Sequence, residues 1–310
     1  MRGVPGTMRL PTAVSRMLCV AVLTVAAGAG LAGCSDSDTS TPNAATTSSS
    51  APAVTVNQAL AEQVPESIRK TGTLTVATAP DNAPIEFVRD GKVVGFDVDV
   101  INQVATILGL RTTVTSVPFG QIVPGVVDGR FDVGARALFD TFARESKADL
   151  VTYFAAGTQW AQRAGGSVDP NNACGLTVAV QEATVQATAE VPAKSKACST
   201  LGDKPIQVIT TDSQQAAVDA VLAGKADAVS ADSPVTAFAV RNAGGKLVTA
   251  GNAFDTDPYA FVVAKGSTLG PAIRGAVQSL IDSGAMEQIA SRWGIEEGLI
   301  TTSVINGATN

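Results

Sequence analysis

The chain has 310 residues and a formal charge of −6, with 22 Lys and Arg against 28 Asp and Glu and no His. Such a chain lacks the basic face of a nucleic-acid-binding protein, and without His it lacks the commonest general base and metal ligand. We therefore expect no nucleic-acid partner, no metal and no cofactor, in a chain long enough for two modest domains.

The N-terminal segment has the layout of a secretory signal. Arg2, Arg9 and Arg16 precede or flank the start of a short apolar run, "LCVAVLTVAAGAG", and "LAGC" follows, ending at Cys34. This ending resembles a lipobox, the site at which bacterial lipoproteins are cleaved before a cysteine that is then diacylated. A transmembrane anchor is the alternative, but the apolar run is shorter than the roughly 20 residues that a spanning helix needs. We predict a signal peptide over residues 1–33 and a membrane-anchored, extracytoplasmic protein.

The segment after the lipidated cysteine is predicted to be a flexible stalk over residues 34–65. Its first part, residues 35–53, is rich in Ser, Thr, Ala and Pro and has almost no bulky apolar side chain. Such a composition buries too little apolar surface to offset the entropy cost of ordering the chain.

Two cysteines remain in the globular part, Cys174 and Cys198. Outside the cytoplasm such a pair is expected to form a disulfide, which would stabilise the fold by roughly 3 to 4 kcal/mol. Two free buried thiols are the alternative. A metal site would need more ligands than two Cys without His.

From about residue 66 the chain alternates between runs typical of strands and of helices, which predicts an α/β fold. The strand-like runs are "TLTVATA", "RTTVTSVP", "FDVGA", "GLTVAVQ", "PIQVITT" and "KADAVSA". The helix-like runs are "VDVINQVATILGL", "QIVPGVVDG", "DSQQAAVDAVLAG", "SPVTAFAVRNA" and "LGPAIRGAVQSLIDSGAMEQIASRWG".

Two segments repeat one pattern, "VVDGRFDVGARALFDT" around Gly129 and "VLAGKADAVSADSPVT" around Gly224. Each has the end of an apolar helix, a Gly, a basic residue, one spacer, an Asp and a buried strand that opens into a polar loop. Two similar α/β units predict two lobes, and ligands of such sheets bind at the carboxyl ends of the strands.

The order of these segments resembles one family, the extracellular solute-binding proteins of polar amino-acid ABC importers, which have the type II periplasmic-binding-protein fold. The resemblance covers nearly all of residues 66–298. It rests on "LTVATAPDNAPIEF", "GFDVDVINQVATILGL", "PFGQIVPGVVDGRFD", the spacing of Thr141, Arg144 and Asp149, "LTVAVQEATVQ", "GKADAVSADSP" and "LIDSGAMEQIASRWG".

The resemblance implies two Rossmann-like α/β lobes joined by two hinge crossings, with the ligand cleft between them. Lobe 1 would hold residues 66–160 and 260–310, and lobe 2 residues 161–259. The implied function is capture of a polar amino acid and delivery to an ABC permease, by a monomer and without chemistry on the ligand. A sensing or scavenging lipoprotein, or a dehydratase-like enzyme on the same fold, is the alternative.

Two residues are implied to hold the backbone of the amino acid. The family's T-x-x-R arginine forks onto the α-carboxylate, and Thr141 and Arg144 have that spacing here. Asp232 lies where the family receives the α-ammonium. The alternatives are a surface charge for Arg144 and a plain N-cap of the next helix for Asp232.

Further positions are implied less directly. The Thr184 hydroxyl would meet the carboxylate or merely cap a helix, and Ala183 stands where the family usually has glycine. Phe119 would be an aromatic wall for the ligand side chain or a core residue. Arg136 and Trp160 would line the pocket or a hinge, or serve structure alone.

Several positions depart from the family. Asn82 lies where many members have an aromatic, and Ala79 where some have an acidic residue that reads a basic ligand. Ala137 and Phe139 replace the glycine and the small hydroxyl residue that commonly contact the ammonium. The amino-acid frame is therefore predicted, and the side-chain specificity stays open.

Overall fold

The computed structural model describes residues 54–309. The predicted signal peptide, the lipid anchor at Cys34 and the stalk up to residue 53 lie outside the described residues. Within residues 54–309, no helix is both long and apolar enough to cross a membrane.

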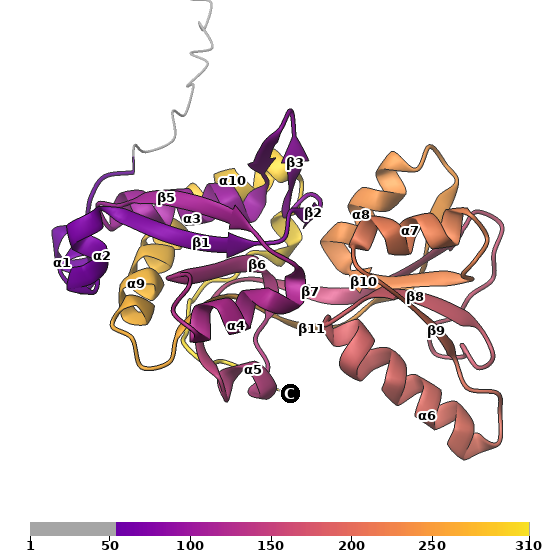
Figure 1. Cartoon of the computed structure of the whole chain (residues 1–310). Helices are drawn as coiled ribbons and strands as arrows, with labels where there is room; N and C mark the ends of the chain where they lie inside the picture. The colour runs from indigo at the N-terminus through magenta and orange to yellow at the C-terminus, as the bar shows by residue number, and fades with distance from the viewer. Residues whose placement is uncertain (1–53, 310) are drawn as a thin grey trace, which may run out of the picture. The chain divides into compact units, whose positions relative to one another are not determined.

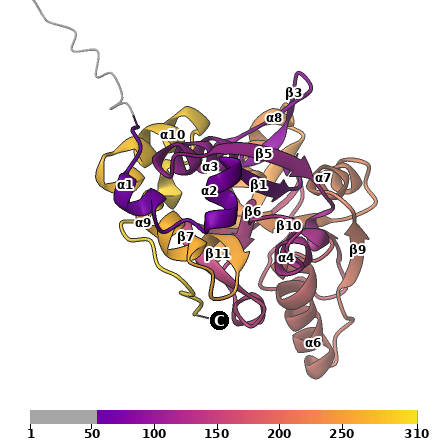
Figure 2. The same cartoon turned by 60° about the vertical axis from the view of Figure 1, so that its left-hand side comes forward.

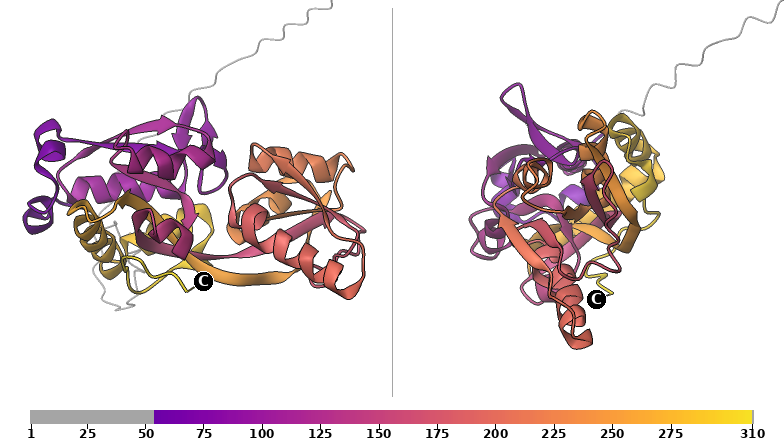
Figure 3. Two further views of the ribbon diagram at one scale, coloured as in Figure 1. Left: turned by 60° about the horizontal axis from the view of Figure 1, so that its bottom comes forward. Right: turned by 90° about the vertical axis from the view of Figure 1, so that its right-hand side faces the viewer.

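The main feature is an eight-stranded sheet with the order β5-β1-β6-β11-β7-β10-β8-β9. Its two long strands, β7 (Ala148–Arg163) and β11 (Leu247–Ala264), run antiparallel in the middle of this order. They pass between two groups of elements, as Figure 1 and the left view of Figure 3 show. We call the group with β5, β1 and β6 the first half, and the group with β10, β8 and β9 the second half.

The first half is built on parallel strands that helices cover. Its strands are β1 (Thr73–Thr78), β5 (Arg111–Ser116) and β6 (Val133–Phe139). A small separate sheet holds β2 (Asp81–Asn82), β3 (Glu86–Arg89) and β4 (Lys92–Val94). The helical elements are α1 (Gln58–Ala61), α2 (Glu66–Thr71), α3 (Phe96–Ile107), η1 (Phe119–Gln121), α4 (Ile122–Val127), α5 (Phe142–Glu145), α9 (Leu269–Asp282), α10 (Ala285–Trp293) and η3 (Glu296–Gly298).

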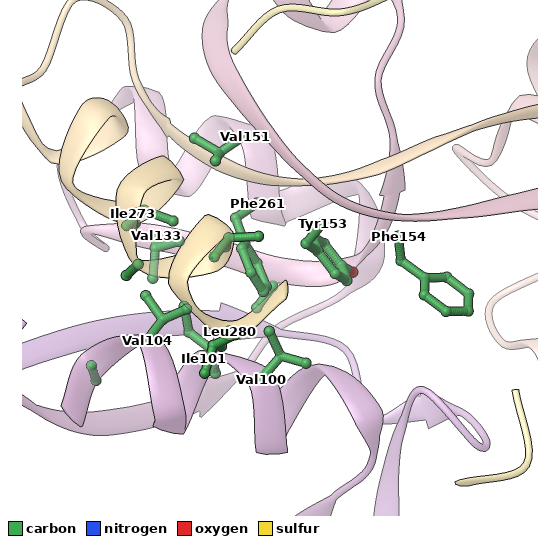
Figure 4. Close-up of a cluster of buried hydrophobic side chains, with 14 of the residues drawn as sticks. Val100, Ile101, Val104, Val133, Val151, Tyr153, Phe154, Phe261, Ile273 and Leu280 are labelled. Carbon is green, nitrogen blue, oxygen red and sulfur yellow. The ribbon is translucent and has the colours of Figure 1, made fainter. Parts of the chain in front are cut away.

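The core of the first half lies between α3, α9 and the long strands (Figure 4). The apolar residues of α3 recur at helical spacing, so that one face is buried while the other carries polar side chains. Tyr153 and Phe261 stack in this core with ring centroids 4.1 Å apart. Removing such apolar surface from water, at about 25 cal/mol per Å², is the main driving force for this packing.

The second half repeats the same organisation. Its strands are β8 (Thr177–Gln181), β9 (Gln207–Thr211) and β10 (Ala228–Asp232), with β10 antiparallel to β7. Its helical elements are η2 (Gln186–Glu190), α6 (Val191–Leu201), α7 (Gln214–Leu222) and α8 (Ser233–Asn242). The predicted alternation of strands and helices, and with it the α/β class, is confirmed.

The repeated sequence pattern has a structural cause. Gly129 and Gly224 both end a helix with a left-handed φ, at 71° and 75°. Three residues later Asp132 accepts a 2.8 Å hydrogen bond from the backbone N–H of Thr75, and Asp227 accepts one of the same length from Thr177. Each Asp therefore fastens the start of its own strand to the neighbouring strand.

The two cysteines of the second half form the predicted disulfide. Cys174 and Cys198 are bridged with their Cα atoms 5.5 Å apart, which ties the loop before β8 to α6. Trp160 is fully buried in the same core, and its indole N–H donates to Glu190 at 3.2 Å. Its surroundings are those of a structural residue.

The predicted stalk ends earlier than residue 65. The backbone N–H of Asn57 donates to the carbonyl of Ile107 at 2.8 Å, Leu60 packs on the first-half core, and Val64 is buried. Gly275 on α9 leaves the room that Leu60 fills, and Figure 2 shows α1 beside α9. The expectation was wrong for residues 54–65, because their few apolar side chains find a surface made by a distant helix.

Candidate functional site

Arg144 belongs to α5, just after β6. Thr141 is the N-cap of this helix, and its hydroxyl accepts the backbone N–H of Arg144 at 3.3 Å. Arg144 is half-buried as a residue, and its guanidinium donates through Nη1 to the carbonyl of Phe139 at 2.7 Å. Within residues 54–309 it forms no ion pair. Burial lowers the pKa of Arg144 to about 10, with the charge of Asp232 opposing this, so the group stays cationic at neutral pH.

Asp232 is the last residue of β10 and the N-cap of α8, but its side chain makes no capping bond. Its Oδ1 accepts from Nε2 of Gln186 at 2.9 Å, and its Oδ2 accepts from the hydroxyl of Tyr259 at 2.7 Å. Burial raises the pKa of Asp232, while the hydrogen bond from Tyr259 and the charges of Arg136 and Arg144 oppose the rise. The carboxylate is thus held in a fixed orientation by groups other than the helix backbone.

The ring of Phe119 contacts the side chains of both Arg136 and Arg144. Its ring, mostly buried in η1, has the Cζ atom of Arg136 4.5 Å from its centroid and that of Arg144 5.8 Å away. The two guanidinium groups lie over one aromatic ring. The charge of Arg136 lowers the pKa of Arg144, and the charges of both arginines lower the pKa of Asp232. The structure therefore brings Phe119, Arg136, Arg144 and Asp232 into one cluster.

Arg136 is the most buried charged group of the cluster, at 1% exposure. Its Nη2 donates to Oδ1 of Asp81 at 2.9 Å and to Oε1 of Gln181 at 2.7 Å, and Gln181 donates in turn to Oδ2 of Asp81 at 2.7 Å. Its Nε lies 3.2 Å from Oε1 of Glu86. Because Gln181 ends β8 and Arg136 lies in β6, these bonds connect the two halves of the sheet.

Several buried polar atoms near the end of β1 have no hydrogen-bond partner among the described residues. They belong to Thr78, Asn82 and Glu86, and to Nε of Arg136. Burial raises the pKa of Glu86 well above its ordinary value, against the opposing charge of Arg136. Burial thus favours the protonated form of Glu86, and Asn82 beside it is fully buried.

Ala137 and Phe139 serve the fold in this structure. Ala137 has a left-handed φ of 41°, and its N–H donates to the carboxyl of Asp97 at 2.8 Å. Tyr153 donates to the same carboxyl at 2.7 Å, and burial raises the pKa of Asp97 to about 6. The Phe139 ring packs 5.0 Å from that of Tyr259. The left-handed φ explains why a glycine would suit position 137.

Thr184 lies at the turn between β8 and η2. Its hydroxyl donates to the carbonyl of Gln181 at 2.7 Å and accepts from the N–H of Ala187 at 3.2 Å, so a capping role is present. Ala183 has a left-handed φ of 61°, the conformation that favours glycine. A Cβ on Gly120 would lie 3.4 Å from that of Ala183, so the turn closely approaches η1. A ligand contact by Thr184 stays a prediction.

The sequence did not single out five residues of the site: Asp81, Glu86, Gln181, Gln186 and Tyr259. Gln181 and Asp81 carried a weak signal, because Gln181 ends β8 and Asp81 comes three residues after the carboxyl end of β1. Tyr259 had none, since it lies inside the long strand β11 and reaches Asp232 only through the pairing of distant segments.

Comparison with known proteins gives a consistent picture. Residues 74–296 match the family of bacterial extracellular solute-binding proteins, family 3. The chain is 37% identical over 246 residues to the arginine-binding protein ArgT of Corynebacterium glutamicum, covering 78% of this chain and 81% of that protein. A probable amino-acid ABC transporter-binding protein of Haemophilus influenzae is 24% identical over 238 residues, which cover 75% of this chain and 89% of that protein.

Solved structures agree. An ancestral arginine-binding protein bound to arginine is 28% identical with a TM-score of 0.65, covering 72% of this chain and 98% of that one. A mutant of the arginine-binding protein of T. maritima is 27% identical with a TM-score of 0.64, covering 74% and 98%. The type II periplasmic-binding-protein fold and the expectation of a binding protein rather than an enzyme are confirmed. The chain belongs to family 3 of the bacterial extracellular solute-binding proteins.

Proposed function

We propose that the protein captures a polar L-amino acid by its zwitterionic backbone, between Arg144 and Asp232, and delivers it to an ABC permease. One observation carries the proposal: a cationic guanidinium with no ion-pair partner in the described chain lies near a buried, oriented carboxylate. A free amino acid supplies the two groups that complete this arrangement, an α-carboxylate and an α-ammonium.

The chemistry of each contact is direct. A planar guanidinium matches a carboxylate with two parallel hydrogen bonds, and such charge-assisted bonds are the stronger kind. Asp232 keeps acceptor lone pairs beyond those used by Gln186 and Tyr259, and these can receive an ammonium. Micromolar affinity needs about −8 kcal/mol, which a few desolvated contacts of this kind supply after ordering costs.

We propose further that the two halves of the sheet are lobes that close on the ligand. Lobe 1 is residues 66–160 with 260–310, lobe 2 is residues 161–259, and β7 and β11 are the hinge crossings. The hydrogen bonds of Arg136 and Asp81 to Gln181 support this, since they join the halves next to the cluster. Closure would remove water from the charged contacts and strengthen them.

The proposed protein is a lipoprotein, tethered through diacylated Cys34 beside the permease. The basic N-terminal residues, the short apolar run and "LAGC" support the tether. Replacement Cys34→Ala should release the protein from the membrane into the medium and abolish labelling with radioactive palmitate. Retention of the variant in the membrane fraction would contradict the lipid anchor.

A thermal-shift panel tests the amino-acid frame. Residues 54–310 would be screened with the twenty L-amino acids and common polyamines, L-arginine included because relatives are named for it. We expect at least one amino acid to raise the melting temperature of the wild type and not that of Arg144→Ala. The control Arg274→Ala removes an exposed arginine of α9 and should keep the full shift. Equal shifts in wild type and Arg144→Ala would refute the site.

A further inference from the structure

The cluster around Phe119 contains a second guanidinium that the proposed backbone clamp does not use. Arg136 lies 4.5 Å from the ring centroid that Arg144 approaches to 5.8 Å, so the two Cζ atoms are at most about 10 Å apart. The side chain of an amino acid with three or four bonds beyond Cα extends about 4 to 5 Å. A ligand held by Arg144 and Asp232 can therefore bring the end of its side chain to Arg136.

Arg136 retains donor capacity toward such a ligand. Its Nη2 is committed to Asp81 and Gln181, whereas Nη1 donates to no group within residues 54–309. Its Nε faces Glu86 at 3.2 Å without an aligned hydrogen bond. A guanidinium has donors only, so what it lacks here is an oxygen acceptor.

The surroundings offer little to a second cation. Asp81 already pairs with Arg136, Glu86 lies 3.2 Å from its Nε, and burial raises the pKa of Glu86 well above its ordinary value, which favours the protonated form. Ala79, in the same apolar cluster as Phe119, contributes no charge either. A ligand guanidinium or ammonium placed here would lie beside the buried cation Arg136, which is costly.

We propose that Arg136 selects amino acids whose side chains end in an oxygen acceptor, a carboxylate or a carboxamide, and disfavours those with cationic side chains. The inference rests on the proposed function, because Arg144 and Asp232 must first hold the backbone of the ligand. L-Glutamate and L-glutamine represent the two sources of the acceptor, and L-arginine and L-lysine the disfavoured class.

A purely structural Arg136, serving only to tie Asp81 to Gln181, is the competing account. The two accounts predict different effects of changing Arg136 on the binding of ligands whose side chains differ in length. A specificity-determining arginine affects ligands with long acceptor side chains and leaves L-alanine, which cannot reach it, unaffected. A structural arginine affects every ligand alike, because it would act through the geometry of closure.

The experiment is calorimetric titration of the purified full chain with L-glutamate, L-glutamine, L-alanine and L-arginine. It uses the wild type, Arg136→Gln, Arg136→Lys and the control Arg163→Gln, in which an arginine bonded to the carbonyls of Val221 and Ala226 is changed. We expect the wild type to bind glutamate or glutamine at least about tenfold more tightly than arginine. Arg136→Gln should lose about tenfold or more for the acceptor-ended ligands alone, and Arg163→Gln should behave as wild type.

The outcomes separate failure of the inference from failure of the proposed function. Preference of the wild type for arginine, or an equal loss for all ligands including alanine in Arg136→Gln, overturns the inference while the proposed function stands. Absence of binding by any amino acid overturns the proposed function and the inference with it. If Arg136→Gln does not fold, the ranking in the wild type and in Arg136→Lys, which keeps the charge but not the planar fork, gives the same decision.

Discussion

Arg136 and Arg144 place their guanidinium groups over the same ring, that of Phe119, yet their surroundings differ. Arg136 is buried and bonded to Asp81 and Gln181, with Glu86 beside it. Arg144 is half-buried, bonded to a single backbone carbonyl, and forms no ion pair within residues 54–309. One arginine is largely supplied with partners by the chain, and the other is not.

This difference assigns different physical roles. A buried charge with protein partners contributes to the folded state, and removing it leaves those partners desolvated and unpaired. A desolvated charge without an ion-pair partner adds little to stability but is available to an anion from outside. The comparison predicts that changes at Arg136 act on stability and side-chain preference, and changes at Arg144 on affinity for every ligand.

The largest expected effect is the loss of stability in Arg136→Met. We expect the free energy of unfolding to fall by about 3 to 5 kcal/mol, because Asp81 and Gln181 lose their buried partner. The matched change Arg144→Met should cost less than about 1 kcal/mol. Urea denaturation followed by circular dichroism measures both, and equal losses would remove the distinction between the two arginines.

The next effect is that of removing the disulfide, which should lower stability without changing any residue of the cluster around Phe119. Replacing Cys174 and Cys198 by Ser should lower the free energy of unfolding by about 2 to 4 kcal/mol. The affinity for the best amino-acid ligand should stay within about twofold of wild type, because the cysteines and Phe119 belong to different apolar clusters. A large loss of affinity would mean that lowered stability alone explains binding defects, including those at Arg136.

Arg144→Lys is expected to weaken binding of the best ligand about 100-fold, which corresponds to about 2.7 kcal/mol. Lysine keeps the charge but cannot form two parallel bonds to a carboxylate. Calorimetric titration measures the change, with Arg274→Lys on the exposed face of α9 as control. An affinity within threefold of wild type would mean that Arg144 does not bind the carboxylate.

The last expected effect is confined to a narrow range of pH and concerns the carboxyl of Asp97. The pKa of Asp97 is raised by burial from 3.8 to about 6, so the folded state holds its proton more tightly than the unfolded chain. Its contribution is therefore favourable below about pH 4 and is lost as pH rises through about 6, by an amount on the order of 3 kcal/mol. Asp97→Asn can keep the bonds to Tyr153 and Ala137 and should flatten the stability curve in this window.

Parallel curves for the wild type and Asp97→Asn between pH 4 and 7 would contradict this assignment. Arg144→Met serves as the comparison variant, because its surroundings contain no such bond to Asp97. It should retain the pH dependence of the wild type.

The sequence predicts the α/β class, the disulfide and the pair of similar units because these depend on local patterns. The T-x-x-R spacing likewise points to Arg144, whose position depends on the short helix α5 that Thr141 caps. The surroundings of Arg136 are different, since Asp81 and Gln181 lie 55 and 45 residues away in the chain. No local pattern encodes such contacts, which arise only when β2, β6 and β8 are assembled.

The end of the stalk illustrates the same limit. Leu60 and Val64 stand in a polar stretch, and nothing near them in the sequence indicates burial. Leu60 fills the space above Gly275 in α9, more than 200 residues later, and Val64 is buried in the same core. That boundary depends on a contact between distant segments, which no local pattern indicates.

The most direct test of the central claim pairs changes in the protein with changes in the ligand. The best-binding amino acid would be compared, by calorimetric titration, with its analogue lacking the α-carboxylate and its analogue lacking the α-ammonium. In the wild type we expect either deletion to cost about 100-fold in affinity. In Arg144→Ala, deleting the α-carboxylate should cost nothing further while deleting the α-ammonium still does, and Asp232→Asn should show the reverse. If the loss of affinity from the change in the ligand simply multiplies the loss from the change in the protein, in both variants, the clamp between Arg144 and Asp232 is contradicted.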